Sequence, residues 1–139
     1  MIILDTNVLS AVIAPAPEKA VVDWIDRQDE AELYLSAVTI FEMRTGIDSL
    51  PTGRGRRELD DAFEDAVKTI IGGRVIPFDR NAASAAGRLA ARRRLVGRAQ
   101  DVRDTQIAGI ALAHDAIIAT RNIRHFADIG LPIIDPWTA

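Results

Sequence analysis

Cysteine is absent from this chain of 139 residues, and aromatic residues make up only 5% of it. The missing cysteine excludes disulfides, zinc–thiolate centres and thiol nucleophiles. The longest apolar run, Ile107 to Ala113, is far shorter than the roughly 20 residues that cross a bilayer. The chain opens on Met1 to Asp5 without a basic segment followed by an apolar signal core. We therefore expect a cytoplasmic protein with no membrane association.

Lysine is scarce as well, since it occurs only at Lys19 and Lys68 and the remaining 15 of the 17 basic residues are arginine. The arginines cluster in two stretches, residues 54–57 and 88–98. Arginine suits bidentate contacts to phosphates or carboxylates, although arginines also cover solvated helix faces. The formal net charge of −3 disfavours a protein whose whole surface binds nucleic acid, but local phosphate-binding patches stay possible.

Hydrophobic residues make up 48% of the chain and charged residues 27%, which fits one soluble domain over residues 1–139. Short apolar runs predict strands at 2–4, 33–35, 75–77, 117–119 and 132–134. Helical spacing predicts helices at 8–13, 21–25, 36–50, 59–70, 80–96 and about 101–112, with a loop at 52–55. Continuously apolar strands between amphipathic helices indicate an α/β sandwich: a mainly parallel central sheet of about five strands flanked by helices.

Acidic side chains follow the predicted strands, at the sheet edge where functional residues of such folds gather. Asp5 directly follows the first strand, and Glu42 lies about one turn into the helix after the second. Asp104 is in the first turns of the helix before the fourth strand, and Asn122 follows that strand. These four side chains could all face one cleft.

Carboxylates held together in one cleft repel each other. Two of them about 5 Å apart cost roughly 3 kcal/mol at an effective dielectric near 20, and a bound divalent cation removes that penalty. Oxygen ligands with no cysteine point to Mg²⁺ or Mn²⁺ rather than zinc. Such an ion lowers the pKa of a bound water and shields phosphate charge, which is what phosphodiester hydrolysis needs.

Each residue also has a purely structural interpretation. Asp5 can cap the first helix, the segment Thr39 to Glu42 fits the capping-box pattern, and Asp104 suits the first turn of a helix. Asn122 can cap a short helical turn. His125 follows in the same segment and could approach the cleft, but a surface position is favoured.

Six segments stand out in order along the chain: Ile2 to Ser10, Leu35 to Gly46, Pro77 to Asp79, Asp104 to Ala111, Ala119 to Asn122 and Asp135 to Trp137. Together they resemble the PIN-domain family, and within it the VapC and FitB toxins of bacterial toxin–antitoxin pairs. The resemblance implies a PIN-like fold and a ribonuclease dependent on Mg²⁺ or Mn²⁺ that leaves a 5′ phosphate and a 3′ hydroxyl. It also implies a homodimer, and a cognate antitoxin protein through which alone operator DNA is bound.

The family's acidic positions fall on Asp5, Glu42 and Asp104, which we expect to hold the metal, with Asn122 as a further catalytic residue. Many relatives have aspartate at or just beyond the position of Asn122, and since asparagine supplies no charge, the number of metals, one or two, is open. Thr6 and Thr120 are expected to orient acids or waters from behind the metal ligands.

Two other functions stay open at this point. A catalytically inactive PIN-like interaction domain is compatible with Asn122. A signalling module phosphorylated on Asp5 is the other, although such modules usually pair adjacent acids after the first strand and need a lysine near a later strand end. Cleavage of RNA by the purified protein, compared with Asp5→Asn, separates the three.

Overall fold

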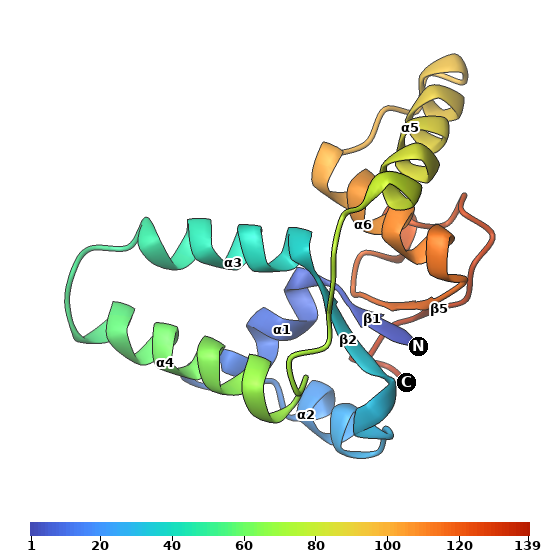
Figure 1. The fold of residues 1–139 in the computed structure, drawn as a ribbon. Helices are drawn as coiled ribbons and strands as arrows, with labels where there is room; N and C mark the ends of the chain where they lie inside the picture. The colour runs from blue at the N-terminus through green and yellow to red at the C-terminus, as the bar shows by residue number, and fades with distance from the viewer.

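The computed structural model describes residues 1–139, which form a five-stranded sheet with helices on both faces (Figure 1). In chain order the elements are β1 (Ile2–Leu4), α1 (Thr6–Ile13), α2 (Lys19–Asp26), η1 (Glu30–Glu32), β2 (Leu33–Ser36), α3 (Ala37–Asp48), α4 (Arg54–Thr69), β3 (Val75–Ile76), α5 (Arg80–Leu95), α6 (Val102–His114), β4 (Ile117–Ala119), η2 (Ile123–His125) and β5 (Ile133–Ile134). The predicted α/β sandwich is confirmed. None of the helices combines the length and the apolar character that crossing a membrane requires.

The sheet is parallel throughout, with the strand order β3-β2-β1-β4-β5. β1 is central, because Ile3 pairs with Tyr34 of β2 on one side and Ile118 of β4 on the other. The chain first extends the sheet through β2 and β3, then returns to the other side of β1 for β4 and β5. The carboxyl ends of β1 and β4 therefore lie at the point where the strand order reverses, the usual ligand position in such sheets.

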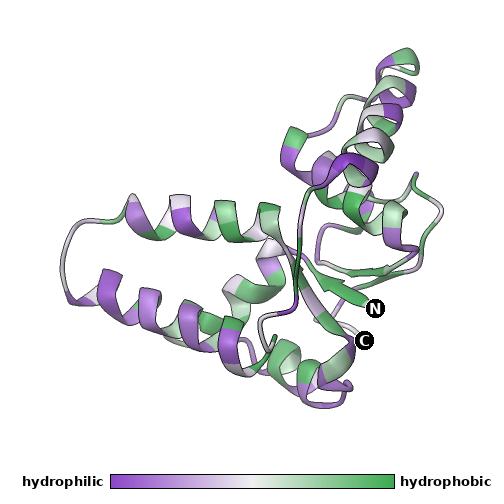
Figure 2. Cartoon of the chain, in the orientation of Figure 1, coloured by the Kyte–Doolittle hydropathy of each residue, from purple (hydrophilic) through white to green (hydrophobic).

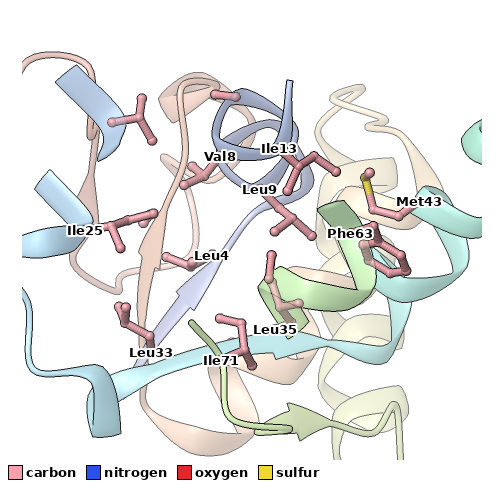
Figure 3. Close-up of a cluster of buried hydrophobic side chains, with 14 of the residues drawn as sticks. Leu4, Val8, Leu9, Ile13, Ile25, Leu33, Leu35, Met43, Phe63 and Ile71 are labelled. Atoms are coloured by element: carbon pink, nitrogen blue, oxygen red, sulfur yellow. The ribbon is translucent and has the colours of Figure 1, made fainter. Parts of the chain in front are cut away.

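Side chains of β1 alternate between two hydrophobic cores. Ile2 and Leu4 pack into a core beneath α1 to α4, whereas Ile3 packs into a second core with α5 and α6. Figure 3 shows the first core, where Leu4 lies near residues of α1 such as Val8. Each fully buried side chain of this kind contributes roughly 1.5–3 kcal/mol. In Figure 2, β1 is hydrophobic along its whole length because both of its faces are buried, whereas α4 has hydrophobic and hydrophilic residues because only one of its faces packs on the core.

The close packing of α5 on α6 explains the alanine-rich sequence of α5. A Cβ atom at Gly109 of α6 would lie only 2.5 Å from the carbonyl oxygen of Ala82 and 2.5 Å from the Cβ of Ala86. Only glycine facing alanine allows the two helices to approach this closely. The contact fixes the position of α6, which carries Asp104.

The predicted loop at 52–55 is partly wrong, because α4 already begins at Arg54. The Gly53 carbonyl accepts the Arg57 amide at 3.1 Å, and Arg54 pairs with Glu58 one turn later at 2.7 Å. Arginine favours helix formation, and Gly55 costs only about 1 kcal/mol relative to alanine inside a helix. The helix therefore extends through this glycine.

Candidate active site

Asp5 lies between β1 and α1 and is only 3% exposed. Its Oδ1 accepts the amide of Thr6 at 2.8 Å, so Asp5 does occupy the cap position of α1. Its Oδ2 accepts the hydroxyl of Thr120 at 2.7 Å. Burial raises the pKa of Asp5 to about 6, although these two hydrogen bonds act in the opposite direction. The charges of Asp104 and Glu42 raise it further.

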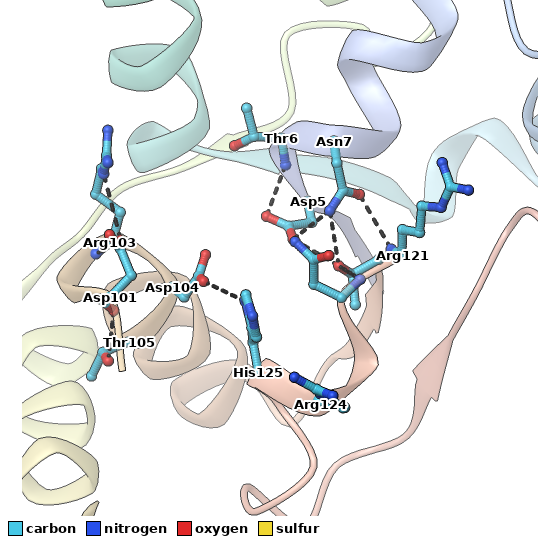
Figure 4. Close-up of polar contacts among 12 residues, drawn as sticks. Asp5, Thr6, Asn7, Asp101, Arg103, Asp104, Thr105, Arg121, Arg124 and His125 are labelled. Carbon is cyan, nitrogen blue, oxygen red and sulfur yellow. Dashed lines mark hydrogen bonds and ion pairs between the residues drawn. The ribbon is translucent and has the colours of Figure 1, made fainter. Parts of the chain in front are cut away.

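The hydroxyl of Thr120 ties the end of β4 to the end of β1. Besides donating to Asp5, it accepts the backbone amide of Asn122 at 3.0 Å and the side-chain amide of Asn7 at 3.3 Å. The same Asn7 amide lies 3.3 Å from Asp5 Oδ2, and the Asn7 carbonyl oxygen accepts the amide of Arg121 at 3.3 Å. Asp5 is thus held by uncharged donors from the start of α1 and from the residue that follows β4 (Figure 4).

Glu42 lies on α3, whose N-terminus is capped by Ser36 through the amide of Thr39 at 3.1 Å. The proposed capping box from Thr39 to Glu42 is wrong, because Ser36 occupies the cap and Thr39 is already inside the helix. Glu42 Oε1 instead accepts the hydroxyl of Thr6 at 2.8 Å, and Oε2 lies 3.8 Å from the guanidinium of Arg103. The Glu42 side chain therefore faces the edge of the sheet.

Asp104 is in the first turn of α6, which Asp101 caps. Its Oδ2 lies 2.8 Å from Nδ1 of His125 (Figure 4). The His125 side chain is partly exposed, as expected, and its ring also approaches the cleft, where it binds the carboxylate of Asp104. The turn of η2 directs the ring back toward α6.

Asn122 follows β4 and precedes η2, as predicted, but its side chain makes no capping hydrogen bond. Its backbone amide is used by Thr120, and the residue lines the same cavity as the acids. The capping interpretation of its side chain is therefore wrong, and the side-chain amide is free to meet a ligand.

One cavity of about 560 Å³ brings the predicted residues together at the carboxyl edge of the sheet. It is lined by Asp5, Thr6, Asn7, Ser10, Ala11, Ala14, Ala16, Glu18, Glu42, Asp104, Arg121, Asn122 and Trp137. Thr120 lies behind it, bound to Asp5. A second hollow of about 640 Å³, between the N-termini of α3 and α6, is mainly apolar and includes Phe41 and Phe78. The three predicted carboxylates line the first cavity and none of them lines the second.

The donor set of this cavity fits a hard cation. Asp5, Glu42 and Asp104 offer carboxylate oxygens, which Mg²⁺ and Mn²⁺ prefer. Burial first, and the charges of Asp104 and Glu42 to a lesser extent, raise the pKa of Asp5, so a cation beside it would be favourable. In the present arrangement no three acidic or imidazole groups meet at one point, because Glu42 is turned to Thr6 and Asp104 to His125. Shared coordination of one ion requires these two side chains to turn toward Asp5.

Three contributors to the site were not assigned a role from the sequence: Asn7, Arg103 and His125. Asn7 and Arg103 are close in sequence to Asp5 and Asp104, so a polar residue within two positions of a cleft acid is the signal that could have found them. His125 is 21 residues from Asp104, and no local pattern links the two. Their contact depends on the packing of η2 against α6.

A family model described as PIN domain matches residues 2–131 of the chain. VapC ribonuclease Y4jK of Sinorhizobium fredii is 40% identical, over 99% of this chain and 98% of the relative. Toxin FitB of Neisseria gonorrhoeae is 32% identical, over 99% of each chain. A solved structure of FitAB bound to a DNA fragment superposes with a TM-score of 0.88 and 33% identity, over 99% of this chain and 96% of that one.

The chain belongs to the PIN-domain family. Within that family its resemblance to the VapC and FitB toxins is confirmed over the full length of the chain.

Proposed function

We propose that the chain is an endoribonuclease dependent on Mg²⁺ or Mn²⁺ and acts as the toxin of a toxin–antitoxin pair. The observation that carries the proposal is the cavity that Asp5, Glu42 and Asp104 share at the carboxyl edge of the sheet. Relatives named VapC ribonuclease and toxin FitB support RNA as the substrate and toxicity as the biological role.

Asp5, Glu42 and Asp104 would hold the cation. When bound, the ion would supply a more acidic water and shield the charge of the scissile phosphate. The remaining residues act by positioning these acids. Thr120 and Asn7 hold Asp5 by its Oδ2, and the Thr6 hydroxyl orients Glu42.

Asn122 lines the cavity on the η2 side, and His125 acts there through its contact with Asp104. Nδ1 of His125 fixes one oxygen of Asp104, which limits how that carboxylate can rotate. Asn122 presents an amide that can accept a hydrogen bond from water or donate one to a phosphate oxygen. Because Asn122 adds no negative charge, the site attracts a second cation less strongly than a site with a fourth carboxylate would.

The partners follow from the same similarity. We propose that a separately encoded antitoxin covers the acidic cavity with an arginine-bearing or apolar helix, since carboxylates lie open there. Contact with operator DNA would come only through the antitoxin, in keeping with a relative, FitAB, whose structure contains DNA. We also propose a homodimer, which the exposed apolar side chains of Phe41, Val102 and Leu95 support.

The test is cleavage of single-stranded RNA by the purified protein with Mn²⁺, with EDTA, and in the variant Asp104→Asn. The matched control is Asp115→Asn, at the other end of α6, where the backbone φ of 50° suits asparagine. We expect cleavage by wild type and by the control, and none with EDTA or with Asp104→Asn. Intact RNA after incubation of the wild type with Mn²⁺ would favour the inactive interaction domain.

Toxicity is tested separately by expressing the chain alone. Growth should stop with the wild type and resume with Asp5→Asn, because toxicity requires catalysis. Equal toxicity of the wild type and Asp5→Asn would show that the growth arrest does not depend on catalysis in this cavity. Co-expression of the antitoxin should restore growth with the wild type.

A further inference from the structure

Positive charge is concentrated in one part of this acidic protein. Residues 80–100 contain six arginines and no acidic residue, whereas the whole chain carries a net charge of −3. This stretch comprises α5 and the loop that leads to α6. The uneven distribution creates a local positive field that can attract a polyanion although the net charge is negative.

Two exposed arginines join this stretch to η2, the turn that follows Asn122. Nη2 of Arg98 lies 3.5 Å from the carbonyl oxygen of Arg124, which belongs to η2. Both residues are exposed and neither forms an ion pair. On α3 and α4, by contrast, Arg44 and Arg54 are paired with acids. Apart from the long hydrogen bond of Arg98 and a small effect of its charge on the pKa of Asp128, these two guanidinium groups have no partner in the protein and can bind an external anion.

The loop that carries Arg124 is anchored from beneath. Arg93 donates to both carboxylate oxygens of Asp128 at 2.8 Å and to the carbonyl of His125 at 2.8 Å. The His125 ring in turn contacts Asp104 (Figure 4). Arg124 therefore stands two residues from Asn122, which lines the cavity, on backbone whose position is fixed before any ligand binds.

We propose that Arg98 and Arg124 bind the phosphodiester backbone of the RNA strand next to the scissile phosphate. This proposal rests on the proposed ribonuclease function and assigns a path for its substrate. The carboxylates of the cavity repel a polyanion, so the phosphates that flank the cleaved one need positive charge nearby. Guanidinium groups match phosphate oxygens bidentately, and such contacts position a strand without reading its bases.

The test measures binding of a fluorescently labelled single-stranded RNA by anisotropy, in EDTA so that no cleavage occurs, between 50 and 200 mM salt. Proteins compared are the wild type, Arg98→Ala/Arg124→Ala and Arg98→Lys/Arg124→Lys. Each lost phosphate contact should reduce the slope of log affinity against log salt by about 0.7. When salt rises fourfold, the affinity of the wild type should therefore fall by a factor about seven times larger than the affinity of the double alanine variant does.

Arg57→Ala is the matched control, because Arg57 is exposed, forms no ion pair and lies in the first turn of α4, far from α5 (Figure 1). Arg57→Ala and the double lysine variant should keep the wild-type slope. Thermal melts establish that all variants fold. The proposal is overturned if Arg98→Ala/Arg124→Ala has the same slope of log affinity against log salt as Arg57→Ala. It is also overturned if the double alanine variant keeps the wild-type slope for RNA but dimerises or binds the antitoxin more weakly.

The two proposals can fail separately. If the wild type does not cleave RNA with Mn²⁺ but the salt slope changes as expected, the ribonuclease function is wrong and the polyanion surface stands. If the wild type cleaves RNA and the slope does not change, the arginine path is wrong and the nuclease stands.

Discussion

Asp5 and Arg93 are both buried charged residues, 3% and 2% exposed, but the protein surrounds them differently. Arg93 donates to Asp128 twice, to the carbonyl of His125 and to the hydroxyl of Thr105. Asp5 receives only uncharged donors, and the nearest charges that act on it are acidic.

The pKa values follow this contrast. The hydrogen bonds from Arg93 lower the pKa of Asp128, so the charged form of that carboxylate is stabilised. Burial and acidic neighbours raise the pKa of Asp5 instead. A charge whose burial is fully compensated serves the architecture, whereas one that the fold leaves uncompensated is typical of a functional site.

The largest expected effect is the loss of activity in Asp5→Asn. Removing a cation ligand should lower the cleavage rate by roughly 1,000-fold, since metal stabilisation of the transition state is worth several kcal/mol. Rates at saturating Mn²⁺, beside far-UV spectra, measure this. Stability should not fall, because the amide replaces an unfavourable buried charge. A variant that unfolds instead would assign Asp5 to the architecture.

The second expected effect falls on stability. Arg93→Met should lower the free energy of unfolding by about 3 kcal/mol, because it leaves the partly buried Asp128 without its partner. Urea denaturation measures the loss. Arg92→Met, an exposed neighbour on the same helix, is the control and should change stability little. Equal losses in the two variants would contradict the contrast.

The pH dependence sharpens the comparison further. The pKa of Asp5 is about 6 in the folded protein, above the 3.8 of an unperturbed aspartate. The folded state thus binds this proton more tightly, and the free energy of unfolding falls as pH rises from about 4 to about 6. The loss in the free energy of unfolding that the ionised Asp5 causes reaches at most about 3 kcal/mol and persists at higher pH.

Asp5→Asn lacks this titration. Without divalent ions, its stability relative to the wild type should be similar near pH 4 and higher by up to about 3 kcal/mol at pH 7. Denaturant melts at a series of pH values measure the difference between the two proteins. A stability difference that does not change with pH would show that the hydrogen bonds of Asp5 compensate for the burial of its charge.

The smallest expected effect concerns Asn122, which lines the cavity without adding charge. Asn122→Ala should slow cleavage by roughly 2- to 10-fold, the value of one neutral hydrogen bond, and leave stability unchanged, because its side chain caps nothing. Asn122→Asp should tighten Mn²⁺ binding by placing a fourth negative charge beside Asp5. Titration calorimetry decides, and unchanged affinity in both variants would exclude Asn122 from the site.

The elements carry different amounts of information in the sequence. Ile2–Leu4 and Ile117–Ala119 are recognisable strands because strands buried on both faces are apolar without interruption. The start of α4 was misplaced because glycines next to Arg54 resemble a loop, whereas neighbouring arginines and a Glu58 pair continue the helix. Local composition alone does not decide between the two.

The sequence by itself determined the alternation of strands and helices, and hence which acids follow which strands. Strand ends of a parallel sheet meet at one edge, so Asp5, Glu42 and Asp104 could be assigned to one cleft. Only the tertiary structure decided which side chains contact each acid: Thr120 binds Asp5 across 115 residues and His125 binds Asp104 across 21. Periodicity reports which face of an element is buried. It carries no record of distant partners, which are set by how the helices pack on the sheet.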